Sequence, residues 1–218
     1  MNSINIKKLK TNLPKEPGVL GKEEYFNSAV LIAIIKINGK DNFLFEKRAA
    51  NIRQGGEICF PGGEIDLKTD STFVDTALRE TKEELGIPKN KIEIIGSMNT
   101  LVGPMGVTVD PVIGFLNISS VEEIIYDEKE VGKVFALPIG FFFKQKPEEF
   151  KLKMEIQPSY INEAGENIIL LPAEELGLPV RYTKPWKAKV HTVLAYRTEF
   201  GTIWGITAKL IYEFIKLV

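Results

Sequence analysis

Residues 29–37 read AVLIAIIKI, an uninterrupted apolar run rich in β-branched side chains. Such a run predicts a β-strand, because branched side chains pack well on a pleated surface. The polar segment NGKDN that follows predicts a turn, and FLFEKRA at residues 43–49 predicts a returning strand. The first part of the core is therefore expected to be a β-hairpin.

Strand patterns continue along the chain, whereas helical patterns are few. Further strands are predicted at residues 57–60, 91–99, 107–117, 131–138, 167–171 and 190–196. Amphipathic helices are predicted from about Ser71 to Leu85 and over residues 207–218. This order of elements predicts an α/β fold in which a mixed β-sheet lies between helices.

The helix near the middle of the chain ends in a dense charge pattern, RETKEELGI at residues 79–87. Its apolar residues recur at three- and four-residue steps, and Gly86 followed by Ile87 and Pro88 predicts where it ends. At about 100° per residue, Glu80, Glu83 and Glu84 fall on one side, away from the apolar stripe. Three carboxylates therefore share one patch.

That patch is unfavourable for an isolated helix end. The C-terminal carbonyls carry roughly half a negative charge, and like charges at i+3 or i+4 repel by a few tenths of a kcal/mol. A divalent cation would relieve the repulsion, since carboxylates at this spacing can hold Mg²⁺ or Mn²⁺. From charge alone, a solvated acidic face paired with Arg79 and Lys82 remains the alternative.

Composition limits the kinds of partner. The 218 residues are 44% hydrophobic and fit one large domain, and 28 basic against 29 acidic residues leave no global field for nucleic acid or an anionic membrane. The single cysteine, Cys59, forms no internal disulfide and suits a reducing compartment. The N-terminal segment lacks the apolar run of a signal peptide. A cytoplasmic protein without a membrane span is expected.

The pattern R-E-x-x-E-E-x-G, a little after a strand that ends in P-G-G, resembles the Nudix box. The resemblance implies an α/β/α sandwich that hydrolyses a diphosphate linked to another moiety, using Mg²⁺ or Mn²⁺. It implies that Arg79 orients a neighbouring glutamate, that Glu80 and Glu84 are metal ligands, and that Glu83 is a ligand or assists the base. The bound cation would then compensate the helix-end repulsion.

The box departs from the family pattern in two ways. Arg79 lies sixteen positions after Gly63, two more than usual, and the family's first glutamate is replaced by Ser71. The extra length falls in a loop, where it costs little. The neighbouring acids, Asp66 and Asp70, are expected to be loop or helix N-cap residues.

A second resemblance narrows the substrate. The segment FEKRAANIRQGGEICFPGG at residues 45–63 is similar to the stretch before the box in coenzyme A diphosphatases, although its second arginine lies one residue nearer the glycine. The segments EVGKVFALP at 130–138 and GTIWGITAKL at 201–210 resemble further parts of that subfamily. Coenzyme A carries about four negative charges, and arginine binds phosphate through a bidentate fork. Arg48 and Arg53 are therefore predicted to bind the substrate.

Other residues have two open readings. Gly62 and Gly63 either let the backbone approach the metal or phosphate, or form a simple tight turn. Glu130 either acts as the base, because other Nudix enzymes recruit an acid there, or is a solvated charge. His191 and Cys59 are expected to be structural, and Trp204 is expected to pack at the start of the last helix rather than stack on adenine.

The expected function is metal-dependent hydrolysis of coenzyme A or a derivative to 3′,5′-ADP and 4′-phosphopantetheine. Two alternatives stay open: a pyrophosphatase for ADP-ribose or another nucleoside diphosphate derivative, and a catalytically silent nucleotide-binding module. We expect a single Nudix domain over residues 1–218, with a leader at 1–26 and an insertion at 144–189. The apolar stretches of that insertion could pack over the site or bury a homodimer surface.

Overall fold

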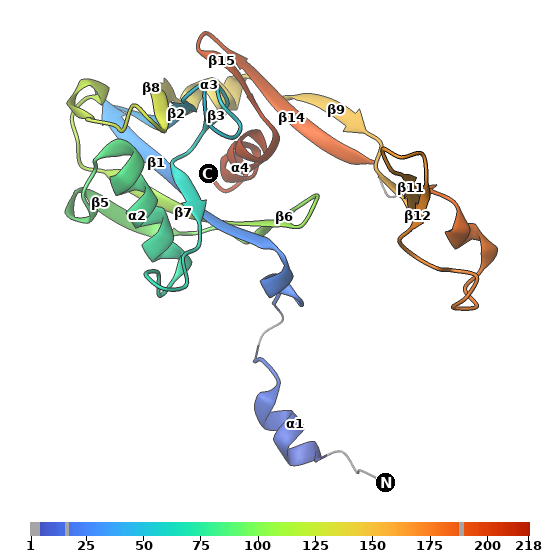
Figure 1. Cartoon of the computed structure of the whole chain (residues 1–218). Helices are drawn as coiled ribbons and strands as arrows, with labels where there is room; N and C mark the ends of the chain where they lie inside the picture. Colours follow the sequence, from blue (N-terminus) through green and yellow to red (C-terminus); the bar gives the residue numbers. More distant parts are fainter. Residues whose placement is uncertain (1–4, 16–17, 188–189) are drawn as a thin grey trace.

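An eight-stranded mixed β-sheet forms the centre of the molecule (Figure 1). The computed structural model describes residues 5–15, 18–187 and 190–218. Strands β1 and β7 run parallel, and the other pairings of this sheet are antiparallel. The strands are β1 (Phe26–Ile37), β2 (Lys40–Arg48), β3 (Ile58–Cys59), β4 (Gly62–Glu64), β5 (Ile92–Ser97), β6 (Leu101–Gly103), β7 (Val107–Leu116) and β8 (Val131–Pro138).

The predicted hairpin is confirmed as β1 and β2. Ile37 pairs with Lys40, so only two residues form the turn between them. These are Asn38 and Gly39, with φ of 50° and 76°. A two-residue turn with both φ values positive matches the twist of the strands it joins, and asparagine and glycine are the residues that tolerate it.

Helices cover both faces of the sheet, which confirms the predicted α/β sandwich. Successive residues of β1 enter two different cores, because side chains alternate across a strand. Leu31 packs in the core beneath helix α2 (Phe73–Leu85), whereas Ile32 packs in the core beneath helices α3 (Ile139–Lys144) and α4 (Gly205–Ile215). In Figure 1, α2 and α4 lie on opposite sides of the sheet.

Helix α2 (Phe73–Leu85) carries the acidic pattern and is fixed at both ends. It begins two residues later than predicted, because Thr72 is the N-cap and forms a reciprocal capping box with Asp75. It ends where predicted: Gly86 adopts φ 64°, and a β-carbon there would collide with the carbonyl oxygen of Ile125. The last turns of α2 are therefore held in a defined position over the sheet.

A second, three-stranded sheet packs beside α4 and joins a segment that extends away from the central sheet (Figure 1). It consists of β9 (Glu148–Leu152), β14 (His191–Thr198) and β15 (Gly201–Trp204). The extending segment contains β10 (Glu155–Ile156), β11 (Ser159–Ile161), β12 (Asn167–Ile169), the 3₁₀ helix Val180–Thr183 and β13 (Trp186–Lys187). The predicted strand at 167–171 thus forms, but outside the central sheet.

The remaining helices are α1 (Ile6–Asn12), α3 (Ile139–Lys144) and α4 (Gly205–Ile215), with 3₁₀ turns at Lys22–Glu24, Lys89–Lys91 and Val121–Glu123. Every residue of α1 is exposed. Among the described residues, no helix has the length and apolar character needed to cross a membrane. Residues 1–4 and 16–17 of the expected leader, and 188–189 of the expected insertion, lie outside the described residues.

Candidate active site

The three glutamates of α2 differ sharply in their surroundings. The side chain of Glu84 is 3% exposed, that of Glu80 is 14% exposed, and that of Glu83 is 57% exposed. The helix therefore presents a gradient from a buried carboxylate to a solvated one. This ordering separates Glu83 from the two residues whose desolvation makes them the stronger candidates for holding a cation.

Glu84 is anchored from two neighbouring elements. The backbone N–H of Gly62 donates to Glu84 Oε2 at 2.9 Å, and Arg48 Nη1 lies 3.9 Å from Glu84 Oε1. Burial, followed by repulsion from Glu46, raises the pKa of Glu84 to about 9. The carboxyl group is thus held in place but lacks enough positive charge to ionise readily.

Glu80 lies beside the second glycine of the P-G-G segment. Arg79 Nη1 donates to Glu80 Oε1 at 2.6 Å, while burial raises the pKa of Glu80 above its ordinary value. A β-carbon on Gly63 would lie 2.5 Å from the Glu80 carboxylate. On Gly62, a β-carbon would collide with the carbonyl oxygen of Ala29. Backbone atoms therefore exclude a side chain at Gly62, whereas at Gly63 only the end of the Glu80 side chain would have to move. Neither contact involves a metal or phosphate, so both readings of these glycines stay open.

Arg79 organises the acids around it. Its guanidinium donates to Glu80, to Glu83 Oε2 at 2.9 Å and to the carbonyl oxygen of Glu64 at 3.0 Å. It also donates to Asp70, from Nε at 3.0 Å and from Nη2 at 2.9 Å. This geometry fits the orienting role that the family resemblance implies for Arg79.

Asp70 lies in the loop before α2, as expected, but it is not a solvated loop residue. It is buried, and hydrogen bonds from Arg79 and Thr76 place its pKa well below the ordinary range. Asp70 is thus a buried acid directly before Ser71, the position where the box lacks its first glutamate. The backbone N–H of Asp66 also donates to Asp70, which folds the loop onto it.

Sequence reasoning overlooked Glu46, which is completely buried on β2. Its Oε1 accepts a hydrogen bond from the Cys59 thiol at 3.4 Å. Burial is the main cause that raises the pKa of Glu46 to about 7. Strand alternation gives the signal that could have found it: Leu44, Glu46 and Arg48 share the face of β2 that packs towards α2.

The two arginines of the upstream segment are placed differently. Arg48 is half-buried beside Glu84, and its Nε donates to the carbonyl oxygen of Arg53 at 3.2 Å. Arg53 is exposed, with its guanidinium carbon 5.9 Å from the ring centroid of Phe26. Arg48 therefore belongs to the acidic cluster, while Arg53 stands at its rim.

Glu130 lies near the same cluster. Its carbonyl oxygen accepts from the backbone N–H of Ala49, and its exposed carboxylate raises the pKa of both Glu46 and Glu80 by repulsion. Glu130 is thus close enough to act electrostatically on the site. Both readings of this residue stay open.

The cluster fits a divalent cation in charge and in donor type. No three Asp, Glu, His or Cys side chains form a ready-made metal cluster within residues 5–15, 18–187 and 190–218. Arg79 donates hydrogen bonds to both Glu80 and Glu83. Yet buried carboxylates gather here with pKa values raised by burial and mutual repulsion, and Glu46 Oε2 has no hydrogen-bond partner. Hard oxygen donors in this state are the ligands that Mg²⁺ or Mn²⁺ prefers.

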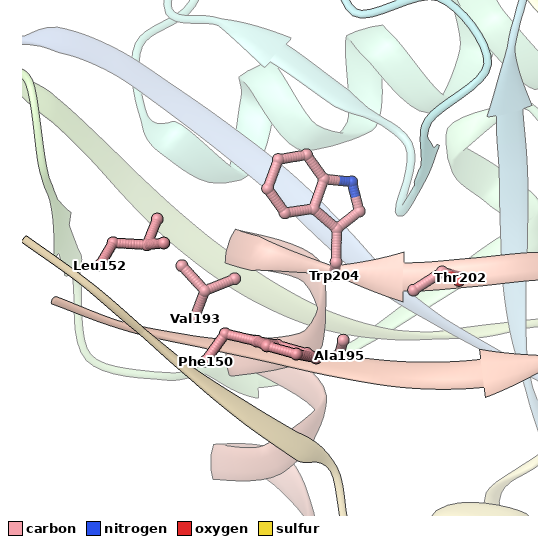
Figure 2. A pocket seen from close by; sticks show the side chains of 6 residues that line it. All are labelled: Phe150, Leu152, Val193, Ala195, Thr202 and Trp204. Atoms are coloured by element: carbon pink, nitrogen blue, oxygen red, sulfur yellow. The ribbon is translucent and has the colours of Figure 1, made fainter.

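Two of the hollows on the surface of the described residues bear on function. One, of about 470 Å³, opens beside Glu80 and Arg79 and is bordered by residues 64–68. The other, of about 360 Å³, lies on the second sheet between Phe150, Leu152, Val193 and Trp204 (Figure 2). The first borders the acidic cluster, whereas the second is apolar and carries no titratable side chain.

Comparison with known proteins identifies the family. Residues 26–192 match the model described as the NUDIX domain. The chain belongs to the Nudix hydrolase family, whose members generally use divalent metal cations.

Two relatives show how far the similarity extends. The chain is 33% identical over 214 residues to an uncharacterised Nudix hydrolase, NudL, of Photorhabdus laumondii, covering 98% of this chain and 95% of that protein. It is 36% identical over 124 residues to Nudix hydrolase 3 of Caenorhabditis elegans, covering 55% of this chain and 51% of that protein. The chain thus spans about half the length of the worm relative.

Solved structures with a related fold include RenU, a Nudix hydrolase from M. smegmatis, at 19% identity and a TM-score of 0.45. That match covers 56% of this chain and 74% of the other. A second is a binary complex of the C. elegans Ap4A hydrolase, at 24% identity and a TM-score of 0.45. It covers 55% of this chain and 84% of the other.

Proposed function

We propose that this chain hydrolyses the diphosphate of coenzyme A or a derivative, with Mg²⁺ or Mn²⁺, giving 3′,5′-ADP and 4′-phosphopantetheine. The observation that carries the proposal is the position of Arg48, whose Nη1 lies 3.9 Å from Glu84 Oε1. The arginine of the segment that resembles coenzyme A diphosphatases therefore borders the acidic helix. A diphosphate between them would meet both a cation site and a guanidinium.

The acids have distinct proposed roles. Glu80 and Glu84, with Glu83, would hold the cation, which neutralises charge on the phosphoanhydride and favours ionisation of an attacking water. Arg79 orients Glu80 and Glu83 through its hydrogen bonds. Glu83 and Glu130 are the exposed acids of the cluster, so either can accept the proton from water.

The substrate's phosphates would be bound by the upstream segment. Gly62 and Gly63 bring the backbone close to Glu84 and Glu80, and the hollow beside Glu80 begins at Glu64, directly after Gly63. Arg48 would contact the diphosphate. Arg53, exposed at the rim and without an ion pair to any residue in the described ranges, would contact the 3′-phosphate.

Two other functions compete with this one. Hydrolysis of ADP-ribose or another nucleoside diphosphate derivative would use the same acids but no 3′-phosphate. A catalytically silent module would need a defective box, and the ion pair between Asp70 and Arg79 argues against that, since it gives Arg79 an acidic partner next to Ser71.

The test compares coenzyme A with its 3′-dephospho form. If Arg53 binds the 3′-phosphate, loss of that charge-assisted contact costs about 1.5 to 3 kcal/mol, so the wild type should cleave coenzyme A roughly ten- to a hundredfold better in kcat/KM. Arg53→Ala should abolish the preference. Lys47→Ala is the matched control, because Lys47 neighbours Arg48 on β2 but projects from the opposite face.

Equal rates on both substrates, or faster cleavage of ADP-ribose, would contradict the coenzyme A assignment and leave the metal site intact. No cleavage of any nucleoside diphosphate derivative with either metal would contradict the enzyme assignment. If Lys47→Ala also lost the preference for coenzyme A over its 3′-dephospho form, that preference could not be assigned to Arg53.

We also propose that the protein is cytoplasmic and forms a homodimer. The free thiol of Cys59 supports a reducing compartment. The apolar hollow of the second sheet (Figure 2) supports a second copy as its occupant, because Phe150, Leu152 and Trp204 are about half exposed there. Sedimentation of Phe150→Asp should then show a monomer, while the control Ile125→Asp, at an exposed apolar residue elsewhere, should leave the dimer intact.

A further inference from the structure

Glu46 occupies a position that an apolar residue would fill at lower cost. Its side chain is 0% exposed. Along β2 it follows the core residues Leu44 and Phe45 and precedes Arg48 by two positions. Within the described part of the chain, its Oε2 is the buried side-chain oxygen that has no hydrogen-bond partner. Buried polar atoms are nearly always paired, so an unpaired one calls for a missing partner.

The surroundings indicate which partner is missing. The negative groups that act on Glu46 are Glu80, Glu84 and Glu130, and the Arg48 guanidinium is the positive one. Arg48 is shared with Glu84 and turns its Nε to the carbonyl oxygen of Arg53. A further positive charge among these carboxylates would give Glu46 Oε2 a partner, and it would also reduce the repulsion between the carboxylates.

A purely structural role explains less. The contact that Oε1 makes is with the Cys59 thiol, a weak donor at 3.4 Å. Such a bond does not compensate for burying a carboxylate. The acidic side chain at this position therefore serves the cluster it faces rather than the strand that carries it.

We propose that Glu46 is an additional carboxylate ligand of the divalent cation held by Glu84 and Glu80. The inference rests on the proposed function, because it uses the same cation. It adds a ligand from the sheet to those from the helix. The cation would then join β2 to the C-terminal turns of α2.

Binding of Mn²⁺ alone tests the proposal without any substrate. Titration calorimetry, with the signal of free Mn²⁺ in electron paramagnetic resonance as a second reading, gives the affinity of wild type, Glu46→Gln and Glu84→Gln. Loss of an outer-shell partner commonly weakens a metal site 10- to 100-fold, so loss of a direct ligand should weaken Mn²⁺ binding by at least about tenfold. Asp41→Asn is the matched control, since it removes an exposed acid from the same strand.

Glu46→Gln should fold, because its amide has the size of the carboxylate and removes a buried charge from the cluster. If it does not, Glu46→Asp withdraws the carboxylate by one methylene and should also weaken binding, while keeping the charge. In the metal-free state Glu46→Gln should melt no lower than the wild type, and Mn²⁺ should raise its melting temperature less.

The outcomes separate the two levels of inference. Unchanged Mn²⁺ affinity in Glu46→Gln, with weakened binding in Glu84→Gln, overturns the role of Glu46 and leaves the proposed function. No Mn²⁺ or Mg²⁺ binding by the wild type overturns the proposed function itself. A loss in Asp41→Asn equal to that in Glu46→Gln would show a nonspecific charge effect and also overturn the proposal.

Discussion

Replacing Asp70 with asparagine should destabilise the protein by about 3 kcal/mol. Removing one partner of a buried ion pair costs about 3–5 kcal/mol, because the other charge is left uncompensated. The Asp70 side chain is 2% exposed and accepts two hydrogen bonds from Arg79. The lower end applies, since the Arg79 side chain is 25% exposed and keeps Glu80 and Glu83 as partners.

Urea unfolding of the metal-free protein measures the difference in free energy of unfolding between the wild type and Asp70→Asn. In a thermal melt of a chain of this length, a loss of about 3 kcal/mol should lower the melting temperature by roughly 6–12 °C. The control is Glu83→Gln, which breaks another bond to Arg79 from a side chain that is 57% exposed. It should cost less than about 1 kcal/mol, as exposed pairs do.

The effect should also depend on pH with a definite sign. The folded-state pKa of Asp70 lies below its ordinary value of 3.8. Its contribution is therefore complete above about pH 5 and lost as the pH falls through 3.8 towards the folded-state value. The gap between wild type and Asp70→Asn should shrink below about pH 4. A gap under about 0.5 kcal/mol at pH 7, or one that Glu83→Gln equals, would refute the reasoning.

Three further outcomes follow from the cluster. Gly63→Ala should keep its stability within about 1 kcal/mol, because only the Glu80 carboxylate must move, yet lose most of its activity in a kinetic assay. Glu84→Gln should lose roughly a hundredfold or more in kcat but raise the melting temperature of the metal-free protein at pH 8. The metal-free wild type should lose stability in urea as the pH rises from about 4.5 towards 9, because the pKa values of Glu46 and Glu84 are raised to about 7 and about 9 in the fold.

Periodicity and turn chemistry were enough to predict the sheet and the helix that carries the acids. The run at 29–37 became β1, and the Asn38-Gly39 turn and Gly86 ended elements where their backbone preferences indicated. The family was predicted correctly from the R-E-x-x-E-E pattern. Each of these features depends on residues that are close in sequence, so it could be predicted without knowing the tertiary contacts.

Residues that depend on tertiary contacts were harder to predict. The burial of Asp70 was not foreseen, because its partner, Arg79, is nine residues away and meets it only after the loop folds back. Glu46 was overlooked because a single acid in a strand pattern is expected to face solvent. Its burial depends on tertiary contacts with β3 and α2, which the local sequence does not encode. The placement of residues 148–187 followed no local pattern, since their short hairpins form away from the central sheet.

The parallel pairing of β1 with β7 has a consequence for how the protein folds. Phe26 pairs with Val107, so the centre of the sheet joins residues about 80 positions apart. Closing so long a loop is entropically costly before any contact rewards it, and non-local pairings slow folding. Helix α2 and strand β4 lie within that loop. Refolding should therefore be slow, and the acidic cluster should become competent for Mn²⁺ only in the last kinetic phase.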